Sequence, residues 1–240
     1  MLLDIIYGGG TFAEKLLYVL IMAIALLPAL TFHEWAHGYA AYKLGDHTAK
    51  ADGRLSLNPL DHLDPVGTVM MLILGFGWAK PVPVITRNFK KPRRDFAITS
   101  LAGPMANFVV GFITTLLYVL GVYICAANEI ENMTAEAILA VLFYSSLFNF
   151  GLGLFNLIPL PPLDGSNVVM CLLPNRIAAK YSKIRYYSRY IFIGLIVMEY
   201  IPYLEIIPQM VFWPISVGRD LLFGLVYNLG ELIFEPIFFG

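Results

Sequence analysis

The feature that most constrains the fold of this chain is an uncharged apolar run at residues 16–32, LLYVLIMAIALLPALTF. A hydrocarbon core of about 30 Å needs about 20 helical residues of this kind, so the run predicts a transmembrane helix. The rest of the chain agrees, because 58% of its 240 residues are apolar and only 14% are charged. A soluble domain carries about 25% charged residues. The chain is therefore predicted to be an integral membrane protein, and both a water-soluble globular enzyme and a disordered chain are excluded.

Further apolar stretches predict additional helices. Residues 96–127 and 135–160 are long enough to cross a bilayer, whereas 190–207 and 210–239 are interrupted by charged residues and proline. We interpret the last stretch as interfacial helices or as one imperfect span. The expected fold class is an all-α polytopic membrane protein with about five to six transmembrane helices.

The distribution of charge orients these spans. Basic residues gather in the segments 43–54, 80–94 and 176–189, whereas the loop 128–136 contains glutamates and no basic residue. Short cytoplasmic loops are rich in Lys and Arg. We therefore expect the basic segments on the cytoplasmic side and the N-terminus outside.

The region near residues 53–85 is expected to be re-entrant or β-like. Its apolar piece, 66–79, has basic segments on both sides, so both of its ends should lie on the cytoplasmic side. A piece this short cannot cross the bilayer twice as a helix. Irregular backbone at membrane depth persists only where it is buried in protein or lines a wet cavity, so we expect such a cavity here.

The chemistry concentrates at the end of the first span, where residues 33–37 read HEWAH. His33 and His37 are four residues apart, so their imidazoles share one helix face and can bind the same zinc ion. The adjacent Glu34 can deprotonate a water molecule held at that metal. Ionisable residues at the end of an apolar helix are costly unless they are functional or paired, which favours a metal centre.

A catalytic zinc usually has three protein ligands, so a third ligand is needed. The candidates in or beside the spans are Asp164, Glu199, His47, His62, Asp52, Asp61 and Asp64. The span 135–160 starts outside and ends on the cytoplasmic side, which places Asp164 at the predicted depth of the two histidines. Glu199 lies roughly 15 Å into the next span. The order of the spans therefore favours Asp164, with Glu199 as the alternative.

Several segments carry a resemblance that covers most of residues 30–165. They read FHEWAHG at 32–38, LAGPMAN at 101–107 and FNLIPLPPLDG at 155–165. In this order they resemble the site-2 protease family of intramembrane zinc metalloproteases. The segments GRLSLNPLDHLDPVG (53–67) and WAKPVPV (78–84) are similar to small members of that family. The pattern indicates a core-only member without a PDZ or CBS-like domain.

The resemblance implies a zinc-dependent endopeptidase that hydrolyses peptide bonds in or near transmembrane segments. Its substrates would be regulatory membrane proteins or remnant signal peptides. One zinc ion per chain would be bound by His33, His37 and Asp164, and Glu34 would act as the general base. The metal would stabilise the oxyanion formed on the substrate carbonyl.

Other residues are expected to contact the substrate. The resemblance implies that Asn156 holds the substrate strand. Val82 and Val84 flank Pro83 in an extended pattern, which could pair with an unwound substrate by strand addition. Asn107 either binds substrate or hydrogen-bonds a neighbouring helix.

The expected core comprises residues 1–165, with catalytic helices 13–44, 96–127 and 135–160, and residues 166–240 form transmembrane or interfacial helices whose role is left open. We expect a bacterial-type inner membrane protein with its active site toward the cytoplasm. Its partners would be the lipid bilayer and a transmembrane protein or peptide substrate. The net charge of −1 excludes bulk electrostatic capture of nucleic acid. The oligomeric state is left open.

Two alternatives are kept open. A non-proteolytic zinc-binding membrane protein could be a transporter or a pseudoprotease adaptor. A transporter should space polar residues along several spans, whereas here they cluster at one depth and Glu34 is intact. A gluzincin-type membrane protease would use Glu199 instead of Asp164 as the third ligand.

Overall fold

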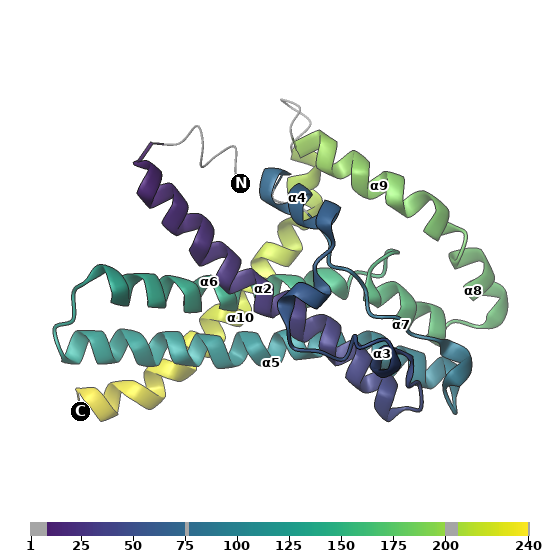
Figure 1. Cartoon of the computed structure of the whole chain (residues 1–240), viewed down its shortest axis with the longest axis horizontal. Coiled ribbons are helices and arrows are strands. Elements are labelled where there is room, and N and C mark those ends of the chain that lie inside the picture. The colour runs from purple at the N-terminus through teal and green to yellow at the C-terminus, as the bar shows by residue number, and fades with distance from the viewer. Residues whose placement is uncertain (1–8, 75–76, 200–205, 240) are drawn as a thin grey trace.

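The computed structural model describes residues 9–74, 77–199 and 206–239 and has the predicted all-α polytopic architecture (Figure 1). The helices are α2 (Phe12–Lys43), α3 (Thr48–Ala51), α4 (Pro65–Leu74), α5 (Pro92–Ala127), α6 (Met133–Asn156), α7 (Asp164–Leu172), α8 (Asn175–Tyr181), α9 (Ile184–Glu199) and α10 (Ile206–Phe238). Two 3-10 turns, η1 (Pro59–His62) and η2 (Thr86–Asn88), lie in the loops between α3 and α5.

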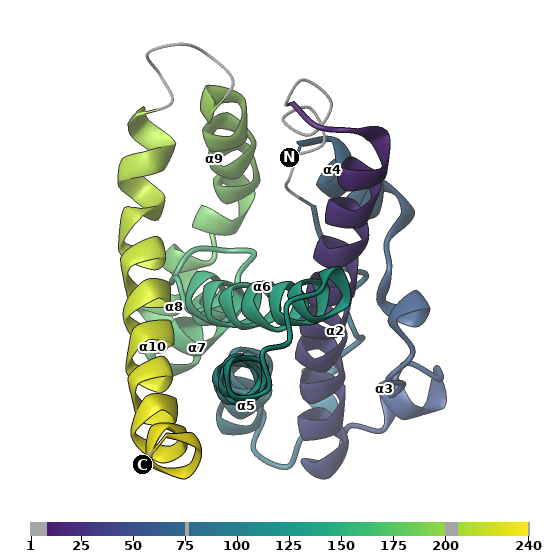
Figure 2. The same ribbon diagram turned by 90° about the vertical axis from the view of Figure 1, so that its left-hand side faces the viewer.

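The long helices form one bundle. Helices α5 and α6 make an antiparallel hairpin that lies between α2 and α10 (Figure 2). Four helices are long and apolar enough to cross a membrane among the described residues: Phe12–Lys43, Pro92–Ala127, Met133–Asn156 and Pro208–Phe238. In the view of Figure 1, the start of α2, the α5–α6 turn and the C-terminus lie at the left end, and α3, α7 and α8 lie at the right end. The basic segments thus share one end.

Small and polar side chains are frequent inside this bundle, whereas many large apolar side chains lie on its outside. Positions at the helix contacts hold Ala29, Thr115, Ser146 and Asn149, and each of these residues is 0% exposed. Large side chains such as Leu225 point outward and are exposed. This arrangement is typical of membrane helices, because small residues let backbones approach and polar groups bond across the contact.

Helix α2 is continuous from the membrane run into the HEWAH motif. Thr11 caps its first turn, because its hydroxyl accepts from the N–H of Glu14 while the Glu14 carboxylate accepts from the N–H of Thr11. Pro28 lies inside the helix without ending it. His33 and His37 consequently sit on a rigid helix, one turn apart.

The region 53–85 doubles back as predicted. An antiparallel bridge joins Leu63 to Ala79, so the two ends of the apolar piece lie side by side. Between them, α4 is too short to span the bilayer. Gly67 permits the close return, because a Cβ there would lie 2.1 Å from the carbonyl oxygen of Trp78. Residues 75 and 76 lie outside the described part.

The helix boundaries required corrections in the second half. Helix α6 ends at Asn156 and not at residue 160, because the following prolines remove helix donors and restrict the preceding residue. Helix α9 begins at Ile184 and ends at Glu199, so its 16 residues reach only about 24 Å, and residues 200–205 lie outside the described part. The stretch predicted at 210–239 as interfacial helices or an imperfect span is one continuous helix, α10.

The division into a core at 1–165 and a C-terminal part stays a prediction. Helix α10 packs against α5 and α6, and α7 packs against α5. The C-terminal helices therefore contribute directly to the bundle that positions the functional residues.

Candidate metal centre

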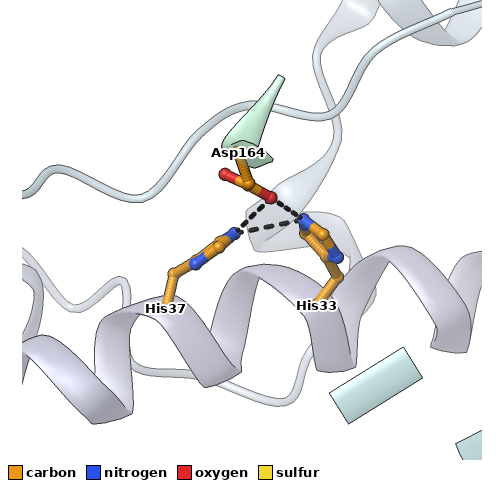
Figure 3. Close-up of side chains that lie close together, drawn as sticks. All are labelled: His33, His37 and Asp164. Atoms are coloured by element: carbon orange, nitrogen blue, oxygen red, sulfur yellow. Dashed lines mark hydrogen bonds and ion pairs between the residues drawn. The ribbon is translucent and has the colours of Figure 1, made fainter. Parts of the chain in front are cut away.

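Two histidines of α2 and one aspartate of α7 bring their side chains together (Figure 3). The Nε2 atoms of His33 and His37 are 3.1 Å apart. Oδ2 of Asp164 lies 3.1 Å from Nε2 of His33 and 3.2 Å from Nε2 of His37. Both imidazoles are buried, and the Asp164 side chain is 17% exposed. The structure thus gathers the three residues that the sequence analysis named as zinc ligands.

Asp164 reaches this cluster because the chain leaves α6 in a non-helical loop. The prolines between residues 159 and 162 keep the loop from continuing α6, and α7 begins at Asp164 itself. Gly165 lets the turn close tightly, because a Cβ there would lie 2.2 Å from the carbonyl oxygen of Leu157. The Leu-Asp-Gly sequence therefore forms a turn that places the Asp164 carboxylate beside the end of α2.

The far nitrogen of each imidazole is bonded to α5. Nδ1 of His33 lies 2.6 Å from Oδ1 of Asn107, and Nδ1 of His37 lies 2.7 Å from the backbone carbonyl oxygen of Thr99. Because a carbonyl oxygen only accepts, Nδ1 of each ring carries the proton and donates. Each neutral ring then presents an unprotonated Nε2 to the cluster.

This donor set fits a zinc ion. Two bare nitrogens and a carboxylate oxygen therefore converge, and a cation resolves their mutual repulsion. Ligands of a tetrahedral zinc lie about 3.3 Å apart, close to the separations observed. Three protein ligands leave the fourth position open, as catalytic zinc sites do.

Gly103 on α5 makes room for both imidazoles. A Cβ at this position would lie 2.4 Å from Nε2 of His37 and 2.8 Å from Cε1 of His33. The segment LAGPMAN therefore has a structural role, because one face of α5 supplies the space at Gly103 and the acceptor at Asn107.

Glu34 lies in contact with the extended strip formed by residues 80–85. Its Oε2 accepts a hydrogen bond of 2.9 Å from the N–H of Val82. Because Pro81 and Pro83 have no N–H, this donor is isolated on the strip. The contact joins the predicted general base to the segment predicted to pair with substrate.

Two buried charged residues hold the strip in place. The guanidinium of Arg54 donates to the carbonyl oxygens of Asp61, Lys80 and Pro81. The carboxylate of Asp46 accepts from the N–H of Ile85 at 2.6 Å and from other donors of the loop. The strip is thus fastened at both ends to the segment that follows α2.

The residues predicted to bind substrate fall in different places. Val82 is buried and Val84 is partly exposed on the strip. Asn156 lies at the end of α6, where its amide donates to the carbonyl of Leu152. Asn107 is fully buried behind His33. Substrate contact by these residues stays a prediction, and the burial of Asn107 favours support of His33.

Several of the other third-ligand candidates are engaged elsewhere or exposed. His47 is exposed beside the ring of Tyr42, and His62 is buried with Nε2 bonded to the carbonyl of Ser56. Asp64 caps α4 through the N–H of Gly67. The side chain of Glu199 lies outside what the structure describes. Among the described residues, the cluster of possible metal ligands is His33, His37 and Asp164.

Sequence reasoning missed several supporting groups. Thr99 acts through its backbone carbonyl, which leaves no signature in the side chain. Asp46 and Arg54 are loop residues whose partners lie far along the chain. Asn149 could have been noticed, because a carboxamide in the apolar run of α6 needs a buried partner.

Comparison with known proteins gives a consistent family assignment. The model of Peptidase family M50 matches residues 119–198, which include Asp164 but not the HEWAH motif. YwhC of Bacillus subtilis (strain 168), a zinc metalloprotease by name, is 41% identical over 219 residues that cover 90% of this chain and 93% of YwhC.

With more distant relatives, the aligned region covers a smaller share of the relative's length. Rip2 of Mycolicibacterium smegmatis, also a zinc metalloprotease by name, is 31% identical over 61% of this chain and 55% of Rip2. Zinc metalloprotease MJ0392 of Methanocaldococcus jannaschii is 25% identical over 70% of this chain and 39% of its own length. No solved structure matches the chain.

Proposed function

The chain belongs to peptidase family M50 and is a zinc metalloprotease, and we propose that it cleaves peptide bonds in or near transmembrane segments of membrane proteins. The observation that carries this proposal is the position of the donor set. His33 and His37 lie on a helix of membrane-spanning length, and Asp164 meets them inside the same bundle. A hydrolytic centre built there is suited to substrates that lie in the membrane.

We assign the metal ligands to His33, His37 and Asp164, with one zinc ion per chain. When bound, zinc would supply Lewis acidity toward water and toward the peptide carbonyl. Glu34 would remove a proton from the attacking water as its oxygen bonds to the carbonyl carbon. The same carboxyl would then donate that proton to the departing amide nitrogen as the carbon–nitrogen bond breaks.

The extended strip would receive the substrate as an added strand. A helical substrate has its backbone groups bonded internally, so it must unwind before hydrolysis. The strip offers the N–H of Val82, which now donates to Glu34, and the N–H of Val84, for which the described residues supply no partner. A peptide carbonyl that binds these donors would lie beside the general base. Asn156 would support the strand from the end of α6.

The family suggests the substrate class, and the orientation suggests the side of the membrane on which the substrate is cut. If the basic end of the molecule faces the cytoplasm, the metal centre lies toward the cytoplasmic side of an inner membrane (Figure 1). Substrates would be regulatory proteins with a transmembrane segment or signal peptides left in the membrane after processing.

The test is Glu34→Gln in the purified full chain, with Glu131→Gln in the exposed α5–α6 loop as the control. We expect Glu34→Gln to abolish cleavage of a transmembrane substrate while zinc stays bound at one equivalent, and the control to behave as the native protein. Removal of general-base catalysis costs on the order of 10²–10⁴ in rate. Cleavage at the native rate by zinc-loaded Glu34→Gln would exclude the assigned mechanism.

A second test separates the two candidates for the third ligand. Asp164→Ala should lower zinc binding strongly, whereas Glu199→Ala should leave it unchanged. The reverse result would make the enzyme a gluzincin-type protease.

A further inference from the structure

A chain of side-chain hydrogen bonds runs behind His33 across three helices. Nδ1 of His33 on α2 contacts Oδ1 of Asn107 on α5 at 2.6 Å. Nδ2 of Asn107 donates to Oδ1 of Asn149 on α6 at 2.9 Å. Nδ2 of Asn149 donates in turn to the backbone carbonyl of Ser145 at 2.8 Å. Asn107 and Asn149 are both 0% exposed.

Backbone carbonyls fix the direction of both carboxamides. Asn107 Nδ2 also lies 3.0 Å from the carbonyl oxygen of Ala29, and Asn149 Nδ2 faces that of Ser145. A backbone carbonyl can only accept, so the amino group of each carboxamide must face it. The oxygen of Asn149 then faces Asn107, and the oxygen of Asn107 faces His33.

We propose that Asn149 is a positioning residue of the metal centre, which acts through Asn107 to keep the proton of His33 on Nδ1 and its Nε2 free for the metal. This proposal rests on the metal site assigned above. A reversed Asn107 would turn its amino group toward Nδ1, and His33 would then carry its proton on Nε2, where it blocks metal binding. Asn149 adds to the hold of the Ala29 carbonyl on Asn107 and resists that reversal by accepting its second N–H.

His37 provides a contrast within the same site. Its Nδ1 donates to the backbone carbonyl of Thr99, which cannot rotate to present a donor. Only His33 depends on a side chain that has two possible orientations. A lock on that orientation is therefore useful at His33 and unnecessary at His37.

The experiment compares Asn149→Leu with Ser146→Ala in the full chain in detergent. Ser146 lies one turn away on α6, is also 0% exposed, and contacts Thr115 of α5 at 2.5 Å. Its loss removes a buried contact between the same two helices without touching the chain to His33. Zinc affinity is measured by competition with a chelator. Outer partners of metal-binding histidines contribute about 10–100-fold in affinity. We expect Asn149→Leu to lose about tenfold and Ser146→Ala to remain near the native value.

A second measurement follows the ring protons of the two histidines. In zinc-loaded protein labelled at histidine nitrogen, Asn149→Leu should accelerate solvent exchange of the Nδ1–H of His33 and leave that of His37 unchanged. Asn149→Asp keeps an acceptor opposite Asn107 and should restore both the affinity and the slow exchange. A general loss of packing would instead affect both histidines and would appear in Ser146→Ala as well.

The outcomes separate this proposal from the assigned function. Native protein that binds no zinc would refute the metal site itself. Zinc-binding native protein with unchanged affinity in Asn149→Leu, or with equal losses in Asn149→Leu and Ser146→Ala, would overturn the role of Asn149 alone. If Asn149→Leu does not fold, the native protein still decides, because a freely exchanging Nδ1–H on His33 contradicts the proposed chain.

Discussion

The two sides of the metal centre are held by different means. On the inner side, between α2, α5 and α6, His33 and His37 are fixed by acceptors on α5, and the support reaches Asn149 on α6. On the outer side, Glu34 meets a non-helical strip through one backbone N–H, that of Val82. The inner side contains groups that must stay in place, whereas the outer side contains groups that a substrate can replace.

This difference matches the tasks proposed for the two sides. Metal ligands need one geometry throughout the reaction, and buried amides bonded at both ends supply it. The general base must accept a proton from water, and the N–H of Val82 now occupies one of the two carboxylate oxygens of Glu34. A peptide carbonyl that takes the N–H of Val82 would release the Glu34 carboxylate. Substitutions on the inner side should therefore affect zinc binding, and those on the outer side should affect cleavage.

The largest expected effect is on the inner side, with Gly103→Val. The new Cβ would lie 2.4 Å from Nε2 of His37, and the helix backbone fixes its direction, so it cannot move away from the ring. We expect zinc affinity to fall more than about 100-fold, beyond the loss from an outer partner, because both ligand rings are displaced. Metal content after dialysis against a weak chelator measures this.

The matched control for Gly103→Val is Gly224→Val on α10. A Cβ at Gly224 meets no heavy atom within 4 Å, although it too is a helical glycine in a membrane-length helix. Native zinc content is expected for this variant. Equal losses in the two variants would mean that valine in any of these helices disrupts the fold, and the inner side would not be special.

The contrast also explains what the sequence could predict. The histidine pair follows from helix periodicity, and Asp164 follows from the order of the spans, because both depend on local patterns and on the two sides of a membrane. The roles of Thr99 and Asn149 could not be read from the chain. A backbone carbonyl has no residue signature, and a buried Asn in an apolar helix looks the same whether it bonds a neighbouring helix or supports a ligand.

Prediction of the fold from the sequence has the same limit, because local patterns were predicted better than long-range contacts. Continuous apolar runs predicted α2 and α5 to within a few residues. The C-terminal helices were harder, because charges inside α10 at Arg219 and Asp220 resemble a break, yet the two side chains pair with each other on the helix. The position of the strip at 80–85 depends on long-range bonds from loop residues, which periodicity does not reveal.

A smaller effect is expected on the outer side, with Arg54→Met. The variant keeps an aliphatic side chain but leaves the carbonyls of Asp61, Lys80 and Pro81 without their donor. The strip should move relative to Glu34, so we expect kcat/KM for a transmembrane substrate to fall about tenfold, which corresponds to about 1.4 kcal/mol. Zinc content should remain at the native level.

Lys50→Met is the control for the outer side. Lys50 is an exposed neighbour whose amino group contacts the hydroxyl and ring of Tyr42. Native activity is expected. Loss of zinc in Arg54→Met would show that the strip also supports the metal ligands, and the division between the two sides would then be wrong.

The smallest expected effect is a pH dependence confined to one end of the strip. Burial would raise the pKa of Asp46, but hydrogen bonds from Thr48, Asn88 and the N–H of Ile85 outweigh burial and lower it. Because the pKa is lower in the folded state, the charged carboxylate contributes its full stabilisation at pH values above the unfolded-state pKa of about 3.9. This stabilisation is lost as the pH falls through the folded-state pKa. The hold on Ile85 should therefore persist from pH 7 to 5 and weaken only below about 4.

Hydrogen exchange of single amides can detect this change within the strip. The N–H of Ile85 donates to the titrating carboxylate of Asp46, whereas the N–H of Lys80 donates to the backbone carbonyl of His62, which does not titrate. After correction for intrinsic rates, the protection of Ile85 should drop a few-fold relative to Lys80 in acid, and Asp46→Asn should remove the difference between neutral and acid pH. If both amides lose protection together, the strip opens as a unit. If Ile85 alone responds, the outer side has one end that is released independently, whereas the inner side has no titrating support in the chain of Asn107 and Asn149.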